Sequence, residues 1–210
     1  MRSYLWFTAI AIWAVIILLK WKFAFIKGKI GEWFVSKKLH ELDPRFYTII
    51  DNITIPSLGG RLEITQIDHV VVSNYGVFCI ETKNYDGWIF GKASEKYWTQ
   101  VIYRYKERFY NPLYQNFAHT KALEALIAPI CPNMTVLSLI AFPSASRLKI
   151  TGTDMVGSSR GIVSKIEQFT RQIISDEEKE RICAILLAAN IKDKKMLKEH
   201  LRGVRSLKNK

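Results

Sequence analysis

The fold is decided by residues 64–85, which read ITQIDHVVVSNYGVFCIETKNY. Both halves of this stretch are rich in β-branched and aromatic residues, and the turn-forming sequence Asn74-Tyr75-Gly76 separates them. Two neighbouring strands joined by a short turn pair as an antiparallel hairpin. We therefore predict a hairpin with strands over residues 64–73 and 77–85.

Alternation along these strands gathers charged side chains on one face of the hairpin. In the first strand Asp68 shares its face with Gln66, whereas His69 points to the opposite face and is expected to be structural. In the second strand Glu81 and Lys83 share a face. The turn folds the strands back on each other, so we expect Asp68 to lie beside Glu81 and Lys83.

Two interpretations of this cluster are open from the residues alone. Charged groups in apolar strands are costly unless they are paired or bind a metal. The structural interpretation is an ion pair between Lys83 and either Asp68 or Glu81. The catalytic interpretation is an oxygen-rich site for a hard divalent cation such as Mg²⁺. Lys83 would then orient or help deprotonate an attacking water and offset charge on a phosphate.

The remaining segments predict a mixed α/β fold. Period-two patterns and turn residues indicate further strands over residues 47–56, 88–90, 97–103 and 135–142. Helical spacing of apolar residues indicates helices over residues 28–42, 111–128, 162–174 and 175–189, the last opened by a capping box at Ser175. This order predicts an α/β sandwich around a small mixed sheet.

Residues 4–19, YLWFTAIAIWAVIILL, contain no charged side chain. As a helix they span about 24 Å, which is short of the hydrocarbon core of a bilayer unless Lys20 and Lys22 extend toward the headgroups. A cleavable signal peptide would need a small-residue cleavage site, and a buried helix is rarely apolar on every face. We predict a retained single-pass transmembrane helix. The lysines that follow it place the rest of the chain in the cytoplasm, at the cell membrane.

Composition favours an anionic partner. The chain has 31 Lys and Arg against 19 Asp and Glu, a formal net charge of +12, which suits nucleic acid or an acidic membrane surface. Its hydrophobic content of 49% excludes intrinsic disorder. The spacing of Cys79, Cys131 and Cys183 matches no zinc motif, so buried thiols in a reducing compartment are expected.

Two basic segments each have more than one interpretation. Residues 92–108 interleave basic and aromatic side chains, which suits either nucleic-acid binding or an amphipathic hairpin with inward-facing aromatics. Residues 192–210 form a basic tail that suits DNA, an anionic membrane or a solvated chain end.

The charged strands carry a resemblance to a known family. Asp68 followed across the hairpin by Glu81-Thr82-Lys83 resembles the PD-(D/E)XK nuclease arrangement. More closely, the strings at 64–73, 76–85 and 87–91 resemble the NERD (nuclease-related) domain, and Gly31-Glu32 and Asn111-Pro112 with Gln115 fit it too. Ile67 stands where the superfamily has a proline. The resemblance covers about residues 28–145.

This resemblance implies a restriction-endonuclease-like fold, a small mixed sheet flanked by helices, and a role for each matching residue. Asp68 and Glu81 would bind Mg²⁺ or Mn²⁺, and Lys83 would be the base that positions water or faces the phosphate. Glu32 would approach the metal from the first helix, unless it is an ordinary helix N-terminal carboxylate. Gln115 would position the phosphate or a carboxylate, unless it is a solvated helix residue.

We therefore expect three regions: a transmembrane anchor over 1–27, a nuclease domain over 28–145 and a basic helical extension over 146–210. The expected function is a membrane-tethered cytoplasmic nuclease that hydrolyses phosphodiester bonds of nucleic acid, DNA rather than RNA, with a metal-activated water. The alternative is a non-catalytic protein that binds nucleic acid or a partner on a nuclease-like fold. His119, one helical turn from Gln115, is given no role.

Overall fold

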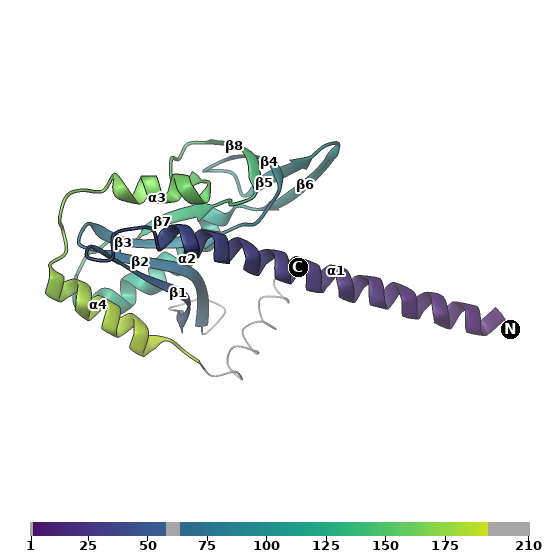
Figure 1. Ribbon diagram of the computed structural model, residues 1–210, viewed down its shortest axis with the longest axis horizontal. Coiled ribbons are helices and arrows are strands. Elements are labelled where there is room, and N and C mark those ends of the chain that lie inside the picture. Colours follow the sequence, from purple (N-terminus) through teal and green to yellow (C-terminus); the bar gives the residue numbers. More distant parts are fainter. Residues whose placement is uncertain (1, 58–63, 193–210) are drawn as a thin grey trace.

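The computed structural model describes residues 2–57 and 64–192, and these residues form two β-sheets with helices packed around them (Figure 1). The helices are α1 (Arg2–Leu39), α2 (Pro112–Ile127), α3 (Ser159–Glu167) and α4 (Asp176–Ala189). The first sheet has the order β1 (Tyr47–Pro56), β2 (Ile64–Ser73), β3 (Gly76–Thr82), β7 (Leu137–Ala141) and β9 (Val156–Gly157). The second has the order β6 (Tyr105–Tyr110), β5 (Tyr97–Ile102), β4 (Gly87–Lys92) and β8 (Ala145–Thr151). The predicted mixed α/β class is confirmed.

The hairpin that organises the first sheet is confirmed. β2 and β3 pair antiparallel, with Ser73 opposite Gly76, so Asn74 and Tyr75 form the turn. β1 adds to the free side of β2, while β7 runs parallel to β3 and β9 runs parallel to β7. β3 is therefore paired along both edges, and all of its residues are buried.

Helices cover both faces of the first sheet, as the predicted sandwich requires. On one face Val70 and Cys79 pack with Leu123 of α2 and Ile182 of α4. On the other face Val71, Phe78 and Ile80 pack with the end of α1 and with α3 through Val35, Leu39, Ile162 and Ile166. Figure 1 shows α1 and α3 along one side of β2 and β3, and α2 with α4 along the other. Complete burial of each large aliphatic side chain stabilises the fold by about 1.5–3 kcal/mol.

The second sheet corrects the prediction of a single small sheet. β6 (YKERFY) and β8 (ASRLKIT) were not expected; both are short and mostly exposed or half-buried. They are held by pairing to β5 and β4. Gly91 of β4 lets the sheet close over its core, since a Cβ there would lie 2.3 Å from Cδ1 of Trp98.

Helix α1 contains the segment predicted to be a membrane anchor. It runs unbroken for 38 residues, so the segment expected to be an anchor and the helix expected from residue 28 form one element. Within residues 2–57 and 64–192, no helix is both long and apolar enough to cross a membrane. The predicted anchor is therefore not supported by the described residues. The location and orientation deduced from that anchor stay predictions.

The C-terminal helices agree with the sequence in part. The capping box of α4 is confirmed, because the Ser175 hydroxyl accepts from the Glu178 amide at 3.2 Å and the Glu178 carboxylate accepts from the Ser175 amide at 2.8 Å. The helix expected over 162–174 is instead α3, which begins at Ser159 and ends at Glu167. The basic tail lies outside the described residues, apart from Lys192.

Candidate active site

The middle of β2 and the end of β3 bring Asp68 and Glu81 together. The pairing of the two strands reaches His69 opposite Ile80, which places Asp68 beside Glu81 at the next position. The Thr82 amide donates to Oδ2 of Asp68 at 2.8 Å and fixes that carboxyl against β3. The juxtaposition expected from the hairpin is therefore present.

Glu81, Lys83 and Gln115 form a closed triangle of hydrogen bonds. The Lys83 ammonium donates to Oε1 of Glu81 at 2.6 Å and to Oε1 of Gln115 at 2.9 Å. The Gln115 amide donates in turn to Oε1 of Glu81 at 2.7 Å. Gln115 comes from the first turns of α2, whose start is fixed by Asn111, since its side chain accepts from the Leu113 amide at 2.9 Å. The triangle thus joins the sheet to the helix above it.

His119, for which no role was predicted, lies at the site. It follows Gln115 by one helical turn and is buried, with Nδ1 at 2.7 Å from Oγ1 of Thr65. Its Nε2 lies 3.5 Å from Oε2 of Glu81 and has no hydrogen-bond partner among the described residues. The i, i+4 spacing from Gln115 was the signal that could have identified it, since such residues share a helix face.

The two carboxyl groups titrate in opposite directions. Glu81 is only 4% exposed; burial opposes its ionisation, but the charge of Lys83 and the contact with His119 outweigh burial and lower its pKa to about 2. For Asp68, burial and then repulsion by Glu81 and Glu32 raise the pKa well above its usual value. Burial also opposes the charge on Lys83, yet Glu81 prevails and raises the lysine pKa. An ionised carboxylate, Glu81, therefore lies beside a carboxyl group with a raised pKa, Asp68.

This donor set suits a hard divalent cation. Carboxylate oxygens are the preferred ligands of Mg²⁺ and Mn²⁺, and a cation would relieve the repulsion that raises the pKa of Asp68. No three His, Cys, Asp or Glu side chains converge on one point in the described ranges. Two protein carboxylates are nevertheless a common set for Mg²⁺, which keeps waters and substrate phosphates as its other ligands.

Glu32 lies near the site without touching its carboxylates. Its charge contributes to the raised pKa of Asp68, and its own carboxylate is paired with Lys29 at 2.6 Å on the same helix. The approach of α1 to the site depends on Gly31, where a Cβ would lie 2.5 Å from Cβ of Asn84, just after Lys83. Glu32 is therefore an electrostatic neighbour of the pair.

Two polar residues of β2 point elsewhere. Gln66 donates to the side chain of Asn52 at 2.6 Å and takes no part in the triangle. His69 lies on the opposite face, as predicted, with Nδ1 at 2.7 Å from Asp51 and Nε2 at 3.2 Å from the Thr82 hydroxyl. His69 thus supports β3 from behind, at the residue between Glu81 and Lys83.

Comparisons with known proteins identify the family of the chain. A protein-family model described as the nuclease-related domain, NERD, matches residues 27–143. An uncharacterized protein of Bacillus anthracis is 38% identical over 177 residues, which cover 84% of this chain and 82% of that protein. No solved structure shows a significant match to the chain. On the family model and this relative, the chain belongs to the nuclease-related domain (NERD) family.

Proposed function

We propose that the chain is a nuclease that hydrolyses phosphodiester bonds, with DNA preferred over RNA, using Mg²⁺ or Mn²⁺ held by Asp68 and Glu81. The proposal rests on one observation. Glu81 is buried and ionised, it lies next to Asp68, whose pKa is raised, and it contacts the Lys83 ammonium. Strongly perturbed carboxyls in contact with a specific charge partner are typical of catalytic sites. Membership of a nuclease-related family supports the same activity.

The cation would supply Lewis-acid stabilisation of the phosphate and lower the pKa of an attacking water. Lys83 is suited to the charge that develops on phosphate oxygens. An ammonium has three N–H donors, and Lys83 uses two of them for Glu81 and Gln115. The third has no acceptor among the residues that the structure describes and would be free to bind a water or a phosphate oxygen. Because the pKa of Lys83 is raised, the group stays protonated and acts as a donor and a positive charge in the resting site.

Gln115 and His119 act on Glu81 and position it. Gln115 holds Oε1 of Glu81, and His119 faces Oε2 with its ring fixed by Thr65. Gln115 thus hydrogen-bonds one oxygen of the carboxylate, and His119 lies close to the other. Replacing either one would change the orientation and pKa of Glu81 without removing a metal ligand.

The direct test is to incubate the full protein chain with linear duplex DNA, with single-stranded DNA and with RNA, and to measure cleavage. Each reaction is run with Mg²⁺, Mn²⁺ or EDTA. Metal-dependent cutting is expected, with DNA cut faster than RNA. It should fall at least about 100-fold in Asp68→Asn and in Lys83→Ala, each checked for folding by circular dichroism. Lys121→Ala is the matched control, since Lys121 lies on α2 but pairs with Glu124 at the surface.

Intact substrates under every condition would contradict the proposal. Retained binding of the same substrates without cutting would favour the non-catalytic alternative. Cutting that persists in EDTA would exclude the metal-dependent mechanism.

A further inference from the structure

We propose that the outer face of the second sheet binds single-stranded nucleic acid. This inference rests on the proposed function, because it assigns a site and a strand state to the nucleic acid that the nuclease would cut. The surface is formed by β4, β5, β6 and β8, whereas the carboxylate pair lies on the first sheet. It consists of the described side chains of these strands that point away from the core.

Strand register separates the two faces of this sheet. Ile89 and Trp98 are fully buried on the inner face and pack with Phe142, Phe109 and Leu148. Residues that alternate with these point outward, and paired residues share a face. The outer face is accordingly defined by its aromatic residues, Trp88, Phe90, Tyr97 and Tyr110, and its basic residues, Lys92, Lys106, Arg108, Arg147 and Lys149.

Three of the four aromatic residues of the outer face are exposed to solvent, and Phe90 is half-buried. Trp88 is 43% exposed, Tyr97 42% and Tyr110 48%, whereas the inner residues Trp98 and Ile89 are fully buried. A cluster of exposed rings on one sheet face is unusual for a surface that has no partner. It provides flat apolar surfaces on which bases can stack.

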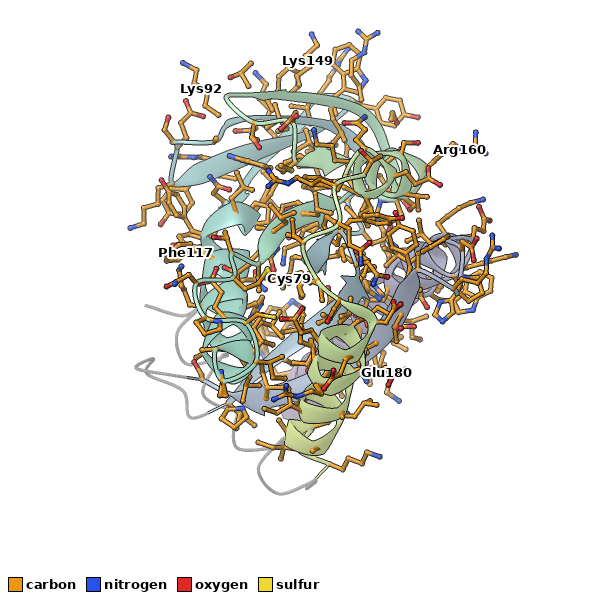
Figure 2. The ribbon with its side chains drawn as sticks, turned by 90° about the vertical axis from the view of Figure 1, so that its left-hand side faces the viewer. Cys79, Lys92, Phe117, Lys149, Arg160 and Glu180 are labelled. Carbon is orange, nitrogen blue, oxygen red and sulfur yellow. The ribbon has the colours of Figure 1, made fainter. Side chains whose placement is uncertain are left out.

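The basic residues of the outer face have no acidic partner. None of the five pairs with a carboxylate within the described residues, and no outward position of these strands carries Asp or Glu in the described register. Figure 2 shows Lys92 and Lys149 projecting into solvent from the same end of the molecule, with Cys79 of β3 near its centre. The face is therefore positively charged and complementary to a polyanion.

Rings and cations alternate closely across this face. The Arg147 guanidinium lies 5.2 Å from the centre of the Trp88 ring, and Lys149 lies 5.1 Å from the same ring. Arg108 lies 5.0 Å from the Tyr97 ring. These long side chains can move from the ring to a phosphate, and a base can then stack on the exposed ring. A strand with one phosphate and one base per step matches such an alternation.

An unpaired strand fits this arrangement better than a duplex. In a duplex the bases stack on each other and their faces are hidden, so exposed rings gain nothing from contact with it. A single strand offers both base faces and phosphates, and proteins bind it through aromatic stacking combined with a basic surface. The exposed rings thus favour single-stranded over duplex nucleic acid, while the basic side chains supply most of the electrostatic attraction.

The test is binding of a fluorescein-labelled oligodeoxythymidine of about 15 nucleotides to the full chain in EDTA, followed by fluorescence anisotropy. EDTA separates binding from hydrolysis. Trp88→Ala should weaken binding between about 5-fold and about 100-fold, the range expected for loss of one stacking ring. The matched control is Trp33→Ala on α1, since Trp33 is 57% exposed and also lies beneath a lysine, Lys37, yet belongs to no such face.

A second variant reports on the charges while keeping every ring. Arg147→Gln combined with Lys149→Gln should reduce the slope of log affinity against log salt by about 1.4, since each lost phosphate contact removes about 0.7 for a single strand. A labelled duplex of the same length should bind more weakly and should not respond to Trp88→Ala.

Equal binding by wild type and Trp88→Ala, or tighter binding of the duplex, would overturn the inference. An unchanged salt slope in the double variant would do the same. Binding as expected in EDTA, but no cutting with Mg²⁺, would instead retain this surface and refute the nuclease. Metal-dependent cutting with no response of binding to Trp88→Ala would retain the nuclease and refute this surface.

Discussion

The Lys83 ammonium, one residue past the end of β3, lies 2.6 Å from the carboxylate of Glu81, which is almost completely buried. The structural and catalytic interpretations of the sequence meet in this contact. An ion pair between these residues is present, and it keeps Glu81 ionised in an apolar environment, which is also what a metal ligand requires. The two interpretations are therefore compatible.

Removal of the lysine charge should destabilise the fold strongly. Lys83→Met keeps the aliphatic volume but leaves Glu81 buried without its cation, which typically costs about 3–5 kcal/mol. The measurement is the free energy of unfolding in urea at neutral pH. Lys121→Met removes the lysine of an exposed pair and should cost less than about 1 kcal/mol. Equal losses in the two variants would show that the Glu81–Lys83 pair is not a buried, essential contact.

Asp68→Asn should make the metal-free protein more stable at neutral pH. Because the pKa of Asp68 is raised in the folded state, its protonated form stabilises the fold. This stabilisation is full below the unfolded pKa near 3.8 and is lost as pH rises through the folded pKa. An amide avoids this loss and can still accept from the Thr82 amide. Thermal unfolding in EDTA should give a higher Tm for the variant. Addition of Mg²⁺ should raise the Tm of wild type only. A lower Tm for the variant in EDTA would contradict the raised pKa of Asp68.

Glu81 should make stability sensitive to acid. Its folded pKa of about 2 lies below the usual value of 4.5, so its contribution is present above pH 4.5 and is lost as pH falls toward 2. The loss amounts to about 3 kcal/mol across that window. Other carboxylates titrate there too, so the comparison is with Glu81→Gln. Unfolding free energies measured from pH 5 to about pH 2 should fall less steeply in that variant. Parallel curves would exclude the depressed pKa.

The close approach of α1 to the site should depend on Gly31. Gly31→Ala would place a Cβ against Asn84 and should destabilise the domain by about 1–3 kcal/mol through overpacking. Gly28→Ala is a matched control one turn away, because nothing lies within 4 Å of the added Cβ. That control should stabilise the helix by about 0.5–1 kcal/mol. Urea unfolding distinguishes the two, and a stabilising effect of both would show that α1 does not pack tightly there.

Local patterns predicted the parts of the fold that depend on local chemistry. The strands 47–56 and 64–73 have the bounds that their β-branched residues indicate, and Ser175 forms its capping box. β6 was missed because all but one of its six residues are exposed, so no buried face marks its sequence. Its strand conformation depends on pairing with β5, a tertiary effect that residue patterns do not encode.

The candidate site was predictable as far as a single hairpin reaches. Register between β2 and β3 places Asp68 beside Glu81, and Lys83 directly follows β3, because both strands and their turn are continuous in sequence. The rotation of α2 about its axis relative to the sheet is set by long-range packing of residues such as Leu123. That rotation decides that Gln115 and His119 face Glu81, so the role of His119 emerged only from the structure.

The central claim is that the Asp68–Glu81 pair binds the metal that drives phosphodiester cleavage. The most direct measurement is the single-turnover cleavage rate of a labelled DNA strand by full-length wild type and Asp68→Asn in Mg²⁺, with the Tm of each protein recorded in EDTA. We predict that Asp68→Asn is folded, at least as stable as wild type, and at least about 100-fold slower in cleavage. A folded Asp68→Asn protein that cuts DNA as fast as wild type would contradict the claim.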